Sequence, residues 1–124
     1  MIINLKNKHT LQVDSFYFKC SIGKNGLIKN KIEGDKRTPK GTFEIEHLYF
    51  RKDRLKKPKT SLKTIEIKEK MGWCDDIKVQ SKYNRLIKIE KNIKQEKLKR
   101  NDQKYDLLIP IKYNFNKIKV GLGS

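Results

Sequence analysis

The stretch that decides the fold is residues 33–43, EGDKRTPKGTF. It is polar, contains two glycines and a proline, and leads into an alternating segment, residues 42–50. Residues 38–41, TPKG, predict a type I turn, because proline fixes φ at the second position and glycine suits the fourth. Upstream, residues 16–22 alternate strictly between apolar and other side chains, and the glycines at the two ends of residues 23–26 predict a tight turn. The sequence therefore predicts two strands joined by a turn and a polar loop.

Strict alternation predicts half-buried strands, since successive side chains of a strand point to opposite faces. In residues 16–22 this pattern places Cys20 on the apolar face, which favours core packing over a reactive thiol. His47 lies on the apolar face of residues 42–50, and a lone histidine inside a strand predicts a packed or hydrogen-bonded residue rather than a base.

Further strands are expected along the rest of the chain. They cover residues 2–13 as a hairpin, 61–67, 82–90 and 105–113. Pro110 indicates an edge or a bulge in the last of them, because proline cannot donate to a ladder. Residues 91–104 are highly charged with few apolar anchors, so we expect a short helix or an exposed loop there.

The composition describes a small and strongly basic chain. It has 124 residues with a formal net charge of +17, and 35% of its residues are hydrophobic. This length predicts a single domain with a modest core. Such a charge attracts polyanions, but the lysines are scattered along every segment, which favours a compositional bias over a dedicated nucleic-acid surface. Residues 1–10 lack the apolar region of a secretory signal and no run reaches the length of a membrane span, so the chain as written is expected in the cytoplasm.

Residues 71–76, MGWCDD, form a second unusual stretch. Three interpretations remain open. Cys74 with Asp75 and Asp76 could bind a metal, but no other ligand lies at suitable spacing. Cys74 could be a nucleophile, although neighbouring carboxylates would raise its pKa. The favoured interpretation is a structured loop in which Trp73 is buried and the aspartates cap backbone amides. A disulfide between Cys20 and Cys74 also stays open.

Several short motifs, taken in order, resemble one branch of the L,D-transpeptidases, bacterial enzymes that cross-link peptidoglycan through a cysteine nucleophile. The resemblance runs from about Phe18 to Ser124. Its motifs are CSIGKNG (20–26), EGDKRTPKGTF (33–43), GWCDD (72–76), YNR (83–85), a series of Glu96, Arg100, Asp102, Tyr105 and Asp106, YN (113–114) and GLGS (121–124). Gln95 and Lys99 depart from that branch, where a histidine and an aromatic residue are common.

The resemblance implies acyl transfer through a thioester, with no cofactor and no metal. It also implies that the family's histidine and its Gly-Cys motif lie downstream of GLGS, so that none of Cys20, Cys74, His9 and His47 matches the dyad. We therefore expect an N-terminal, C-terminally truncated part of the domain, inactive alone and with no catalytic residue of its own. The peptidoglycan of the resemblance lies outside the membrane, whereas no export signal is seen, so localisation stays open. Oligomeric state is not predicted.

The expected fold is mainly β, a sandwich or partly closed barrel with one short helix at most, in a single domain over 1–124. The resemblance suggests residues for the wall of a substrate cleft that takes stem peptides. They are Trp73, Asp75, Asp76, Tyr83, Asn84 and Arg85. One alternative is a small basic module that binds nucleic acid or another polyanion through lysines and exposed Tyr17 and Tyr83. A third is a thiol hydrolase built on Cys74.

Overall fold

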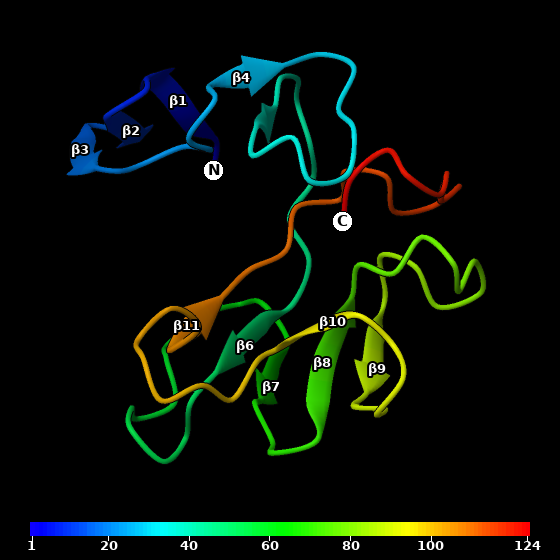
Figure 1. Cartoon of the computed structure of the whole chain (residues 1–124). Helices are drawn as coiled ribbons and strands as arrows, with labels where there is room; N and C mark the ends of the chain where they lie inside the picture. The colour runs from blue at the N-terminus through cyan, green and yellow to red at the C-terminus, as the bar shows by residue number, and fades with distance from the viewer. The chain divides into compact units, whose positions relative to one another are not determined.

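The computed structural model describes all 124 residues, in two compact units, Met1–Gly41 and Thr42–Ser124 (Figure 1). Both consist of strands and loops without a helix, and the strands form four small sheets, none of them closed into a barrel. The predicted mainly β fold is confirmed. The assignment of 1–124 to a single domain stays a prediction.

The first unit begins with a three-stranded antiparallel meander of β1 (Ile3–Asn7), β2 (Thr10–Val13) and β3 (Phe16–Lys19). The predicted hairpin over residues 2–13 is confirmed. The predicted half-buried strand over 16–22 is wrong in two respects. β3 ends at Lys19, so Cys20 follows the strand, and all four residues of β3 are exposed. The reason is that β3 contacts only β2 among the strands of its unit, at the edge of the meander.

The second sheet of this unit is a short parallel pair, β4 (Leu27–Ile28) and β5 (Thr38–Pro39). The predicted type I turn over 38–41 is therefore wrong. The Thr38 and Lys40 N–H groups donate to the carbonyls of Gly26 and Ile28, which holds the segment extended. Pro39 lies between these two donors, at a position where a ladder needs no N–H.

A turn at Ile32–Asp35 replaces the one predicted over 38–41. The Asp35 N–H donates to the Ile32 carbonyl, and the Asp35 carboxylate accepts from the Ile32 and Arg37 N–H groups and from Lys31 Nζ, each at 2.9 Å. Partial burial raises the pKa of Asp35, but these bonds outweigh it and hold the pKa at about 2. The predicted turn at Gly23–Gly26 is confirmed by the Gly26 N–H bond to the Gly23 carbonyl.

The second unit contains two three-stranded sheets (Figure 1). In one, β6 (Leu48–Phe50) lies between β11 (Leu107–Leu108), which is antiparallel to it, and β7 (Thr64–Glu66), which is parallel. In the other, β8 (Met71–Cys74) lies between β9 (Leu86–Lys88) and β10 (Gln95–Lys97), both antiparallel to it.

The core of this unit draws on both sheets and the loops between them. Its centre is Tyr49, Ile67 and Leu98, and the partly buried residues packed on it are Ile65, Met71, Trp73, Leu86, Tyr105 and Leu108. Burying an aliphatic side chain of this size contributes roughly 1.5–3 kcal/mol. These few side chains therefore fix how β8 lies against β6 and β7.

Three predictions for this unit need correction. Residues 71–74 form the central strand of a sheet rather than a loop. Residues 91–104 contain β10 rather than a helix, because Leu98 is buried and its N–H donates to the Met71 carbonyl. The strand expected over residues 105–113 is shorter: β11 covers Leu107–Leu108 alone, at the edge of its sheet, and Ile109 and Ile111 are about two-fifths exposed. Pro110 follows the end of β11, and the edge position of β11 agrees with the edge or bulge that this proline indicated.

Candidate functional site

Asn84 is a buried asparagine that connects three separate parts of the second unit. It lies just before β9, is only 5% exposed and has a positive φ of 53°, which asparagine adopts more readily than most residues. Trp73 Nε1–H of β8 donates to Asn84 Oδ1 at 2.9 Å, and Asn84 Nδ2 donates to the Asn114 carbonyl at 2.6 Å. The GWCDD, YNR and YN motifs therefore meet at one side chain.

The GLGS segment, residues 121–124, is hydrogen-bonded to the same group of residues. Asn114 Nδ2 donates to the Gly123 carbonyl at 3.0 Å, and the Tyr113 hydroxyl donates to the Leu122 carbonyl at 2.7 Å. The Gly123 N–H in turn donates to the hydroxyl of Tyr83, whose side chain is completely buried. Residues far apart in sequence thus form one polar cluster, which we call the Asn84 cluster: Trp73, Tyr83, Asn84, Tyr113, Asn114, Leu122 and Gly123.

Cys74 lies next to this cluster but cannot reach solvent. It is 0% exposed, and its backbone is fixed by bonds from its N–H to the Arg85 carbonyl and from the Asn84 N–H to its carbonyl. A thiol must become a thiolate and meet its substrate to act as a nucleophile. A buried strand position suits a packing role for Cys74 and does not favour the thiol-hydrolase interpretation.

The two acids after β8 differ in what they bind. Asp76 caps backbone amides as predicted, with Oδ1 accepting from the Lys78 N–H and Oδ2 from the Lys94 N–H. These bonds, the Lys94 one first, lower the pKa of Asp76. Asp75 has one oxygen, Oδ2, at 3.5 Å from Lys94 Nζ, whereas its Oδ1 is buried without a hydrogen-bond partner. Asp75 therefore keeps an unused acceptor beside the Asn84 cluster.

The structure brings the six predicted cleft residues into one region, in two groups. Trp73, Tyr83 and Asn84 are built into the Asn84 cluster, so they support the region rather than line it. Asp75 and Asp76 follow β8 directly, and Arg85 follows Asn84 with its side chain exposed. The second group, Asp75, Asp76 and Arg85, therefore has more solvent-accessible surface for a ligand than the first group.

Sequence reasoning missed the part played by Asn114, which has a positive φ of 47° and three side-chain bonds within residues 114–123. The YN motif at 113–114 was the only signal for it. The two histidines lie elsewhere: His9 is exposed in the first unit, and His47 is half-exposed beside Glu46 rather than packed in the core. Both cysteines are free, and no group of three His, Cys, Asp or Glu side chains is placed to hold a metal ion.

The model of the YkuD family, described as the L,D-transpeptidase catalytic domain, matches residues 1–113. The all-β fold agrees with this class of protein, and the match includes the motifs at 33–43, 72–76 and 83–85. The chain belongs to the YkuD family of L,D-transpeptidase catalytic domains. No match is found among the curated proteins or the solved structures. The structure contains no helix that is long and apolar enough to cross a membrane.

Proposed function

We propose that this chain supplies the substrate-binding scaffold of an L,D-transpeptidase, acting on peptidoglycan stem peptides. The family makes peptidoglycan the expected substrate. The observation that carries the finer proposal is the Asn84 cluster, which joins β8 to the YNR and YN segments and so holds the backbone next to the exposed Arg85 in place. An exposed guanidinium suits a peptide that carries a free carboxylate.

The catalytic step of the proposal is acyl transfer, which needs an accessible thiolate and a base within hydrogen-bond reach. Cys74 is buried and its backbone belongs to a strand. Both observations support the proposal that residues 1–124 are catalytically inactive by themselves. Within the proposal, these residues bind and orient a stem peptide, and the reacting thiol is none of their own.

The test is a titration of the protein with a tetrapeptide stem, followed by amide chemical shifts. We expect saturable shifts near Asp75 and Arg85, and a loss of affinity of roughly fivefold in Arg85→Gln, the size of one exposed charged contact. Arg37→Gln is the matched control, because Arg37 is also exposed and lies in the first unit. Mass spectrometry with the same peptide should show no acyl adduct on Cys74.

Two results would overturn the proposal. One is equal weakening by both arginine variants, which would indicate attraction by net charge alone. The other is absence of stem-peptide binding together with binding of a single-stranded oligonucleotide that falls steeply with salt. That second result would favour a polyanion-binding module, for which Tyr17 is 65% exposed but Tyr83, contrary to expectation, is fully buried.

A further inference from the structure

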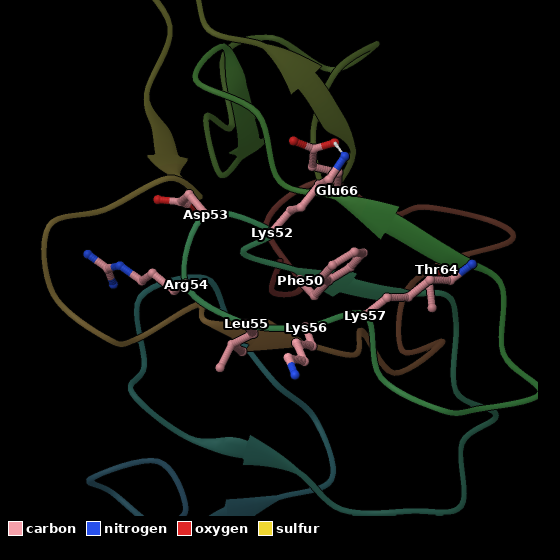
Figure 2. Close-up of a pocket in the computed structure, with 9 residues that line it drawn as sticks. All are labelled: Phe50, Lys52, Asp53, Arg54, Leu55, Lys56, Lys57, Thr64 and Glu66. Carbon is pink, nitrogen blue, oxygen red and sulfur yellow. Dashed lines mark ion pairs between the residues drawn. The ribbon is translucent and has the colours of Figure 1, made fainter.

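A hollow of about 680 Å³ lies beside the loop that joins β6 to β7, within the second unit (Figure 2). Small-molecule sites have volumes of roughly 300–1,000 Å³. Its walls combine apolar and cationic side chains with two acids. The lining residues are Phe50, Lys52, Asp53, Arg54, Leu55, Lys56, Lys57, Thr64 and Glu66. It shares none of the residues of the Asn84 cluster, so it is a separate site.

The loop is held in shape by Arg51, which is 5% exposed. Its guanidinium forms two bonds with the Asp53 carboxylate, at 2.8 and 2.7 Å, and a third with the Arg100 carbonyl at 2.6 Å. The carbonyl of Arg51 accepts from the Arg54 and Leu55 N–H groups, which closes a turn. The backbone that carries the hollow's cations is therefore organised before any ligand arrives, which reduces the entropy lost on binding.

Arg54 strengthens the same arrangement from the other side of the loop. Its guanidinium donates to Asp106 Oδ1 and to the carbonyls of residues 100–102, and in Figure 2 its side chain extends away from Phe50. Both guanidiniums are thus occupied by acceptors of the protein. A ligand carboxylate, which arginine binds with two parallel bonds, would find no free guanidinium here.

The cations that remain available are ammonium groups. Lys56 and Lys57 are exposed and form no ion pair, and Figure 2 shows Lys57 extending toward Thr64. Lys52 lies on the other side of Phe50, where its Nζ is 3.9 Å from Glu66 Oε2 in an exposed pair that is readily exchanged. Lysines act as point charges toward phosphate oxygens and carry them on flexible stems. In Figure 2 the three side chains extend in different directions, so a bound anion would draw them toward the hollow.

The hollow is larger than a bare phosphate ion needs, and part of its lining is apolar. Leu55 and the small exposed part of Phe50, which is 5% exposed, supply apolar surface, and the Thr64 hydroxyl adds a neutral hydrogen-bonding group. A ligand that uses all of these groups has a phosphate and an organic part that packs on Leu55 and the exposed part of Phe50. From this geometry we infer that the β6–β7 hollow is a binding site for a phosphate ester, a role that goes beyond the proposed function.

Binding is tested with phenyl phosphate on the full chain, followed by the amide shifts of Leu55, Lys57 and Thr64. We expect saturable binding that is tighter than that of inorganic phosphate, with benzoate weaker still. Lys56→Gln with Lys57→Gln should weaken it by roughly tenfold. The matched control is Lys117→Gln with Lys119→Gln, which removes the same charge from exposed lysines of the same unit that form no ion pair.

Equal weakening by the two double variants would overturn the inference, since the effect would then follow net charge. Binding of benzoate as tight as that of phenyl phosphate would also overturn it, because the site would then not prefer a phosphate to a carboxylate. A second arm uses vesicles that contain phosphatidylglycerol. Competition between vesicles and phenyl phosphate in the wild type, lost in the Lys56 and Lys57 variant, assigns the phosphate to a lipid headgroup; binding of phenyl phosphate without such competition assigns it to a soluble ester.

Discussion

At the residue scale, Asn84 is the side chain that joins β8 to the segment at residues 113–114. Its amide satisfies Trp73 Nε1 and the Asn114 carbonyl, and both would lose a partner on truncation. A buried polar group left without a partner costs about 1–3 kcal/mol. Alanine would also be strained at the positive φ of this position. We expect Asn84→Ala to lower the free energy of unfolding by roughly 2–4 kcal/mol, measured by urea titration.

Asn84→Gly separates the two causes, because glycine tolerates positive φ but cannot make the side-chain bonds. We expect this variant to recover about 1 kcal/mol of the loss seen with alanine and no more. A glycine variant as stable as the wild type would show that the bonds from Trp73 and to Asn114 contribute little. In that case contacts other than the Asn84 hydrogen bonds would hold the GWCDD, YNR and YN motifs together.

At the element scale, Gly23 decides how its turn packs against the polar loop of residues 33–41. A Cβ at this position would lie 2.6 Å from the Lys36 carbonyl oxygen and 2.8 Å from Arg37 Cα. These are backbone atoms, so the loop itself would have to move. We expect Gly23→Ala to break the β4–β5 pair, seen as loss of hydrogen-exchange protection at the Thr38 and Lys40 amides.

The matched control for this element is Gly34→Ala. Gly34 has a φ of 79° but open space around it, so alanine there meets backbone strain of about 1–2 kcal/mol and no clash. In the Gly34→Ala variant, the amides of Thr38 and Lys40 should remain protected from hydrogen exchange. If both variants lose protection equally, the close approach at Gly23 has no structural role.

The same elements show what could be predicted from the sequence. The hairpin over 2–13 was predicted because its alternation is local and its two strands pair across a short turn. The strand at 86–88, within the predicted 82–90, was recognised from its alternation alone, although its partner β8 is distant in sequence. The strand at 71–74 and the pairing of β4 with β5 were missed. Their partner strands lie ten or more residues away, and no alternating pattern in these short segments indicates a strand. Glycine and proline chemistry indicated a turn at 38–41, but distant pairing overrode that preference.

The candidate site was predictable to a similar degree. Family motifs singled out Trp73 and Asn84, whose side chains do meet, but they gave no sign of which residues are structural and which are exposed. Tyr83 and Cys74 are structural because their side chains are buried. Their burial results from the packing of the whole unit, which no single motif contains. The Arg51–Asp53 pair escaped notice because RKDR looks like ordinary surface charge until its third partner, the Arg100 carbonyl, is known.

At the scale of the whole molecule, the chain carries 31 lysines and arginines against 14 acids, so its carboxylates have many cations to pair with. Three of these acids have a pKa of about 2, against an ordinary 3.8: Asp35, Asp53 and Asp102. For Asp53 the main cause is the hydrogen bond from Arg51, and for Asp102 the one from Arg100. A carboxyl whose folded pKa is lowered stabilises the fold above its unfolded pKa, and the stabilisation disappears as pH falls toward the folded pKa.

The resulting prediction concerns acid unfolding. Stability should be flat from neutral pH to about 5 and fall between about pH 4 and pH 2, as these carboxyls lose their charge. Asp53→Asn isolates one of them, because asparagine has no charge to lose. Its melting temperature should lie several degrees below that of the wild type at pH 6, and the gap should close by pH 2. High salt should reduce the general acid sensitivity, which includes repulsion among the cations, yet leave most of this gap, because Arg51 is largely buried. A gap that stays constant from pH 6 to pH 2 would mean that Asp53 stabilises the loop through its shape rather than through its charge.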